Sequence, residues 1–220
     1  MEKRWNSLCN SLGVSAERAA SLWVLLSSKY SEPTRYYHTL THIDALLQLA
    51  EEYARSLRNR NVVDLAIFFH DVIYDPTASD NEEKSALLFE EVMGSLLDVD
   101  IVQVVSAYII ETKKHDVSGS EDSDLKYFID FDVAVLGANR EEYTKYAADI
   151  RREYIHVEES VYCTARPKFM RAFLQNTEFI YATEVFRADR EAQARANIAW
   201  ECDLLESGSL GSIVSLEGSS

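Results

Sequence analysis

Hydrophobic residues recur every three or four positions through most of the chain, which is the spacing of amphipathic α-helices. The first clear case is residues 15–30, where Ala19, Leu22 and Leu26 share one helical face. A second helix is expected to begin after Thr41, whose side chain suits the N-cap position. Later amphipathic stretches are expected to form helices over residues 139–155, 158–175 and 184–206.

One segment is apolar on nearly every side: residues 61–74, with the sequence NVVDLAIFFHDVIY. A helix of this kind is expected at the centre of a bundle, and a buried strand is the alternative for so short a run. A further helix is expected after a loop that begins at Asp75, with Ser79 or Asp80 as its N-cap residue. The next helix is expected over residues 98–116.

Glycine and proline are scarce, at 7 and 3 in 220 residues. A turn-rich β-sandwich or β-barrel would need more of both, so an all-α helical bundle with short connections is predicted. No linker divides the chain, and one domain is therefore expected over residues 1–206. The Gly/Ser-rich end, residues 207–220, is expected to be a flexible tail.

The charge balance excludes several kinds of partner. The chain has 22 Lys and Arg against 37 Asp and Glu, a formal net charge of −15. Such a surface repels nucleic-acid backbones and anionic lipid, although a local cationic or metal-bearing pocket can still receive a small anion. The three cysteines form no CxxC pair, and no signal peptide or membrane-length apolar run is present. A cytoplasmic location is therefore expected.

Histidines and aspartates stand at the ends of the predicted core helices. His70 and Asp71 end the apolar segment, and His42 begins the helix before it. Asp130 and Asp132 lie in the apolar run YFIDFDVAVL. Two imidazoles and two carboxylates suit a divalent cation that keeps open positions for water and substrate. The sequence therefore predicts a metal site at the inner ends of these helices.

The order His…His-Asp…Asp on a helical chain resembles the HD superfamily of metal-dependent phosphohydrolases. The stretches RYYHTLTHI, FFHDVIYDP, DNEEKSA, EFIYAT and ARANIAWE resemble one branch of predicted members, over about Arg35 to Glu206. The resemblance implies a helical bundle with a metal-site core at about 35–137, additional C-terminal helices at 139–206, and phosphoester hydrolysis. Tyr74 and Asp75 stand where the alarmone-hydrolase branch has a Glu-Asp pair, which argues against a guanosine tetraphosphate substrate.

Carried over position by position, the resemblance places the metal ligands at His42, His70, Asp71 and Asp132, with Asp130 as the alternative to Asp132. The residues do not choose among Mn, Fe, Mg, Ni and Zn, nor between one ion and two. His115 fits the place where many relatives hold a second metal or the substrate phosphate.

Several side chains near these ligands are candidates for contact with the substrate. Besides His115, the candidates for substrate binding are Arg35, His38 and Asn81, of which Arg35 suits bidentate contact with phosphate oxygens. Besides the metal ligand Asp71, Glu82 or Asp75 is expected to orient the attacking water or protonate the leaving oxygen. The alternative for Glu82 is that it, Asp80 and Glu83 only favour the helix N-terminus electrostatically, with Ser85 exposed.

The expected function is hydrolysis of a small phosphorylated molecule, such as a nucleotide or another phosphomonoester, by a metal-activated water. A cyclic or linear phosphodiesterase could use the same ligands, and a non-catalytic metal- or nucleotide-binding module is a second alternative. A di-iron oxygenase of the HD type ranks last, because it requires a larger ligand set. An apolar stripe on the C-terminal helices would allow a homodimer or would close the core.

Overall fold

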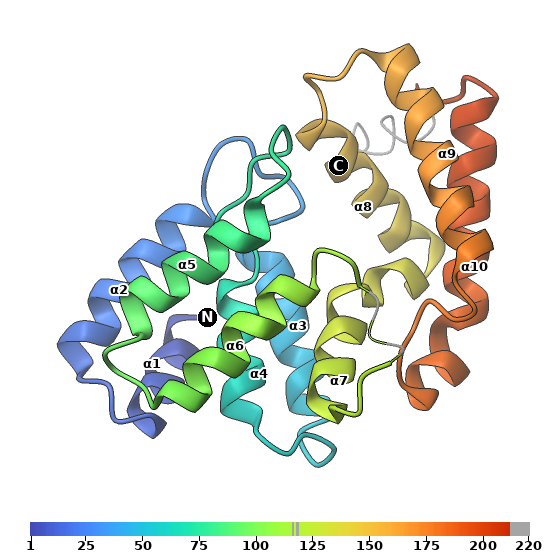
Figure 1. Ribbon diagram of the computed structural model, residues 1–220. Coiled ribbons are helices and arrows are strands. Elements are labelled where there is room, and N and C mark those ends of the chain that lie inside the picture. Colours follow the sequence, from blue (N-terminus) through green and yellow to red (C-terminus); the bar gives the residue numbers. More distant parts are fainter. Residues whose placement is uncertain (116, 118, 212–220) are drawn as a thin grey trace. The chain divides into compact units, whose positions relative to one another are not determined.

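The computed structural model describes residues 1–115, 117 and 119–211 (Figure 1). All regular structure in this part of the chain is helical, with ten α-helices, one short 3₁₀-helix and no strand. The predicted all-α fold class is therefore confirmed. Of the expected flexible tail at 207–220, residues 212–220 lie outside the described residues.

The chain divides into two compact units, Met1–Phe131 and Asp132–Ser220, and each is described by itself. The prediction of one domain over 1–206 stays a prediction. The helices of the first unit are α1 (Glu2–Ser11), α2 (Ala16–Lys29), α3 (Leu40–Glu52), α4 (Arg60–Phe69), α5 (Asn81–Met93), α6 (Val99–Glu111) and α7 (Ser123–Asp132), whose last residue begins the second unit. The second unit continues with η1 (Ala134–Gly137), α8 (Arg140–Glu153), α9 (Glu159–Asn176) and α10 (Glu184–Glu206).

Helix α4 lies at the centre of the first unit, where it packs against α3, α5 and α6. The segment is helical as far as Phe69, and no strand follows in residues 70–74, so the strand alternative for residues 61–74 is excluded. Seven of its ten residues are buried: Val62, Val63, Leu65, Ala66, Ile67, Phe68 and Phe69. Each large apolar side chain removed from water contributes about 1.5–3 kcal/mol, so α4 is firmly held and carries the residues that follow it to the centre of the unit.

Helix α1 covers one side of this core, although the sequence pattern did not predict it. Its Trp5 is fully buried and packs edge-to-face against Phe68 and Phe69 of α4. The indole Nε1 of Trp5 donates a hydrogen bond to the carbonyl oxygen of Ala19, at 2.8 Å, which joins α1 to α2. Burial raises the pKa of the nearby Cys9 thiol to about 11, so this cysteine is an inert packing residue.

Helix α3 begins earlier than predicted. Thr39, rather than Thr41, is the N-cap residue, and its side chain accepts a hydrogen bond from the backbone N–H of Thr41. Both threonines can cap a helix, and the choice of Thr39 places His42 in the first turn of α3, where it is buried.

The second unit is built around a long pair of helices, α9 and α10, which lie side by side (Figure 1). Asn197 of α10 is fully buried, and its side-chain amide donates to the carbonyl oxygens of Leu136 and Ala138, both at 2.8 Å. Gly137 lies so close to α10 that a Cβ there would come within 2.6 Å of the Cβ of Arg190. These contacts explain why a glycine ends η1.

A buried carboxylate ties three helices of the second unit together. Glu201 of α10 is 1% exposed and accepts hydrogen bonds from the Tyr143 hydroxyl of α8, at 2.6 Å, and from Arg166 of α9. Burial, together with the charge of Glu201, raises the pKa of Tyr143, so its hydroxyl stays a proton donor.

None of the described helices is both long enough and apolar enough to span a bilayer. Large apolar side chains do reach the surface of the second unit, at Ile155, Val161 and Phe169. The expected homodimer stays a prediction.

We expect Glu201→Ala to destabilise the second unit by about 3–5 kcal/mol, because it leaves Arg166 without its counter-charge and Tyr143 without its acceptor. Glu206→Ala is the matched control, since Glu206 pairs with Arg171 across the exposed side of the same helices and should cost less than about 1 kcal/mol. Urea denaturation followed by tryptophan fluorescence measures both variants. Equal losses of stability would contradict the role given to the buried carboxylate.

Candidate metal centre

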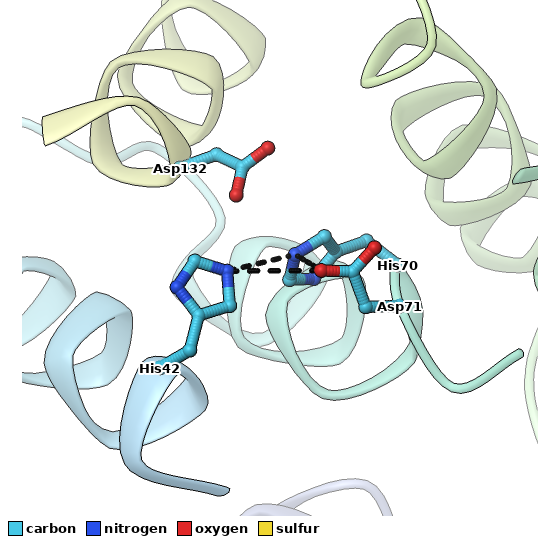
Figure 2. Close-up of side chains that lie close together, drawn as sticks. All are labelled: His42, His70, Asp71 and Asp132. Carbon is cyan, nitrogen blue, oxygen red and sulfur yellow. Dashed lines mark hydrogen bonds and ion pairs between the residues drawn. The ribbon is translucent and has the colours of Figure 1, made fainter. Parts of the chain in front are cut away.

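Two histidines and two aspartates come together where α3, α4 and α7 meet (Figure 2). His42, His70, Asp71 and Asp132 each offer one ligand atom, and all four atoms lie within 4.8 Å of one another. The histidines are 4% and 1% exposed, and the aspartates are half-buried. Asp132 is the last residue of α7, whose other residues belong to the first unit, so the group is described with that unit.

The orientation of the His70 ring is fixed by the helix that it ends. His70 is the C-cap residue of α4, and its Nδ1 lies 3.0 Å from the carbonyl oxygen of Ile67. Because a carbonyl oxygen can only accept, Nδ1 carries a proton and donates this hydrogen bond. In the neutral ring, Nε2 therefore keeps its lone pair and points it at the group, as metal-binding histidines do when a carbonyl holds the other nitrogen.

The distances within the group fit a shared cation. His70 Nε2 lies 3.0 Å from Asp71 Oδ2 and 3.3 Å from His42 Nε2, and His42 Nε2 lies 3.7 Å from Asp71 Oδ2. Ligand atoms about 2.1 Å from one metal ion lie about 3 Å apart when they are at right angles. Four lone-pair donors this close repel one another unless a proton or a cation lies among them. The group could therefore hold a metal ion.

The structure distinguishes between Asp130 and Asp132, which the sequence offered as alternatives for the fourth ligand. Asp132 belongs to the group, whereas Asp130, two residues earlier in α7, is fully buried and is not one of the four. Residues two positions apart on a helix point about 200° away from each other, so only one of them can face His42.

The backbone just after the His-Asp pair is held by Arg35, from the loop before α3. The Arg35 side chain is fully buried, and its Nη1 donates to the carbonyl oxygen of Asp71 at 2.6 Å, while Nη2 donates to that of Val72 at 3.0 Å. Nη1 also donates to the carbonyl oxygen of His38, and Nε to the carboxylate of Glu32. Four of its five N–H groups are thus engaged, and a bidentate phosphate contact would require Arg35 to release a backbone carbonyl.

Helix α5 holds the next part of this backbone with two side chains. The hydroxyl of Ser85 accepts from the N–H of Ile73 at 3.0 Å and donates to its carbonyl oxygen at 3.2 Å. The amide of Asn81 does the same for the backbone N–H and carbonyl oxygen of Asp75. Ser85 is fully buried, so the expectation that it would be exposed is wrong. The motif DNEEKSA therefore has a positioning role that the sequence did not reveal.

Aromatic rings line the side of the group next to His42. The ring of Tyr37 lies 4.8 Å from that of His42, and the His38 ring stacks on Tyr74 with 4.1 Å between centroids. Arg35 lies over the Tyr74 ring, 5.5 Å from its centroid. His38 is thus next to the proposed ligands, as predicted, and its ring is only partly buried.

Other predicted residues lie outside the four-residue group. Asp75 is exposed, and its Oδ1 accepts hydrogen bonds from the backbone and the hydroxyl of Thr77. Glu82 lies in the first turn of α5 and is half-buried. His115 follows α6 with a φ of 51°, a left-handed conformation that costs a non-glycine residue about 1–3 kcal/mol. Their predicted roles stay predictions.

Comparison with known proteins gives no relative: no family model, no curated protein and no solved structure matches this chain. The resemblance to the HD superfamily therefore stays a prediction. The helical fold and the buried group of two histidines and two aspartates are established independently of it.

We expect Arg35→Met to destabilise the protein by about 3 kcal/mol or more, because three carbonyl oxygens lose their donor. Thermal and urea denaturation measure the loss. Arg55→Met is the control, because Arg55 is exposed just after α3 and its replacement should change stability by less than about 0.5 kcal/mol. If the two variants were equally stable, Arg35 would not hold the backbone at Asp71.

Proposed function

We propose that this chain is a metal-dependent phosphohydrolase that cleaves a phosphoester of a small molecule, with nucleotides and related phosphomonoesters as the substrate class. The observation that carries the proposal is the buried group of His42, His70, Asp71 and Asp132. These are the positions at which the resemblance to the HD superfamily predicts metal ligands. Two imidazoles and two carboxylates leave room for water and substrate on Mn, Fe, Mg, Ni or Zn.

A divalent ion at this group would lower the pKa of a coordinated water and polarise a phosphoryl oxygen. The chain's own contribution is to hold the ligands in place beforehand. The Ile67 carbonyl oxygen orients the ring of His70, and Arg35 fixes the backbone of Asp71. Because these contacts are present in the folded chain, little reorganisation is required when substrate binds.

For the proton transfers we favour Glu82 over Asp75. The Oδ1 of Asp75 accepts two hydrogen bonds from Thr77, and such bonds stabilise a carboxylate in its charged form. A carboxylate stabilised in this way is seldom protonated at neutral pH, so it rarely has a proton to give to the leaving oxygen. Glu82 lies in the first turn of the helix that also holds the segment after Asp71, which supports its assignment to the leaving group.

Contact with the substrate phosphate is assigned to His38. Its partly buried ring lies next to that of His42, with 5.9 Å between centroids, whereas the guanidinium of Arg35 is occupied by backbone carbonyls. Since the chain carries a net charge of −15, an anionic substrate depends on local groups of this kind for its attraction.

We expect His70→Ala to weaken Mn²⁺ binding by at least about tenfold, since a ligand oriented by Ile67 is lost. Metal content of the purified, reconstituted protein and titration calorimetry with Mn²⁺ measure the effect. His156→Ala is the control, because His156 is exposed on the second unit and should bind the wild-type amount. Unchanged metal content in His70→Ala would overturn the assignment of the site.

We expect the wild-type chain with added Mn²⁺ to release phosphate from at least one member of a panel of nucleotides and phosphomonoesters. Asp71→Asn should lower the rate of phosphate release by roughly a hundredfold or more. Turnover of a diester such as bis(p-nitrophenyl) phosphate, without monoester turnover, would make the chain a phosphodiesterase. Metal binding without turnover of either ester would favour the non-catalytic module, and oxygen consumption with iron would favour the oxygenase.

A further inference from the structure

The ring of Tyr74, three residues beyond Asp71, contacts the residue to which the substrate phosphate is assigned. It lies against the imidazole of His38 with 4.1 Å between centroids and 28° between the ring planes. This contact is face to face, whereas His38 meets Tyr37 and His42 edge to face. A stacked neighbour restricts the plane of a ring, so Tyr74 restricts the directions in which the ring nitrogens of His38 can point.

The backbone on either side of Tyr74 is held by α5. The hydroxyl of Ser85 binds both backbone groups of Ile73, at 3.0 and 3.2 Å. The side-chain amide of Asn81 binds both backbone groups of Asp75, at 3.0 and 2.9 Å. Two hydrogen bonds to each neighbour leave the residue between them little backbone freedom, so the position of the Tyr74 ring is set before any ligand binds.

Arg35 holds the ring of Tyr74 and the backbone of His38 at the same time. Its guanidinium carbon lies 5.5 Å from the centroid of the Tyr74 ring, a cation–π contact, and its Nη1 donates to the carbonyl oxygen of His38 at 3.2 Å. The guanidinium is itself fixed by the carbonyl oxygens of Asp71 and Val72. The stacked pair is therefore tied to the same cation as the backbone of the candidate ligand Asp71.

The orientation of the His38 ring matters because an imidazole N–H is a directional donor. A hydrogen bond to a phosphoryl oxygen weakens steeply when the donor points away from that oxygen. A side chain that becomes ordered only when the ligand binds lowers the affinity by about two- to tenfold. A ring that is already stacked in place avoids this loss.

We propose that Tyr74 is a positioning residue, whose ring holds the imidazole of His38 so that a ring N–H meets a phosphoryl oxygen of the substrate. The inference rests on the proposed function, in which His38 contacts the substrate phosphate. Tyr74 acts through stacking, and its hydroxyl is not required. The motif DNEEKSA thereby gains a part in the site, because its Asn81 and Ser85 hold the segment that carries Tyr74.

The stack is tested by nuclear magnetic resonance on the metal-free full chain with isotope-labelled histidine, in which His38→Ala identifies the His38 signals. We expect nuclear Overhauser contacts between the ring protons of His38 and Tyr74 in the wild-type chain. Tyr74→Leu should shift the His38 signals downfield, because the ring current of the stacked tyrosine is lost, and Tyr74→Phe should leave them nearly unchanged. Absence of the contacts, or no shift in Tyr74→Leu, would overturn the proposal.

The role of the stack is tested by titration calorimetry of the Mn²⁺-loaded chain with methylphosphonate, which carries phosphoryl oxygens but no ester bond. We expect Tyr74→Leu to weaken binding by about three- to tenfold, and Tyr74→Phe to bind like the wild type. His38→Ala should weaken binding by about tenfold or more, and adding Tyr74→Leu to it should cause no further loss. Additive losses, or no binding by the wild type, would overturn the proposal.

Tyr127→Leu is the matched control, because the half-buried ring of Tyr127 packs on Tyr53 and Phe131 in the same unit. It should bind methylphosphonate like the wild type, and a loss equal to that of Tyr74→Leu would count against a specific role for Tyr74. If Tyr74→Leu fails to fold, the wild-type Overhauser contacts and the affinity of Tyr74→Phe decide. Failure of the phosphohydrolase function gives a different result: methylphosphonate binding follows the expected pattern while no phosphoester is cleaved.

Discussion

The hydrogen bonds from Arg35 to the carbonyl oxygens of Asp71 and Val72 are the contacts on which the geometry of the candidate metal centre depends. Asp71 follows the last residue of α4 and its C-cap, so helical hydrogen bonds no longer determine its position. A side chain from another part of the chain must do so. Arg35 also donates to the carbonyl oxygen of His38, just before α3, and one buried cation therefore links the segments that carry His42 and Asp71.

The burial of α4 makes the depth of His70 possible. An imidazole and a carboxylate at the centre of a helical unit lose their hydration, and that loss must be offset by the surrounding structure. Seven buried side chains of α4 supply apolar contacts on every side, so the helix keeps its position although it ends in polar groups. The apolar burial of α4 therefore offsets the free energy lost when the polar side chains of the candidate metal centre are removed from water.

The helical fold could be predicted because it depends on a repeating pattern, whereas the details of the site depend on packing. The spacing of apolar residues predicted most helices within a few residues. It missed α1, whose buried face consists of only Trp5, Leu8 and Cys9. The pattern could not choose between Asp130 and Asp132, because the rotation of α7 about its axis is set by its neighbours. It could not reveal that Ser85 and Asn81 form hydrogen bonds with backbone groups, since serine and asparagine are common both on the surface and in the interior, and the residue type alone does not tell these cases apart.

The buried polar groups of the described residues differ in the partners that complete their hydrogen bonds. This difference distinguishes residues with a structural role from those of the candidate site. Glu201 is matched by Arg166 and Tyr143, and Arg35 is matched by carbonyl oxygens and Glu32, so each is complete within the chain and has a structural role. At His42 and His70 the arrangement is of another kind, because their Nε2 atoms lie 3.3 Å apart and both belong to the group of four possible metal ligands. Lone pairs at such distances repel unless a proton or a cation lies between them, so this convergence of possible ligands, rather than burial alone, marks the group as a candidate metal site.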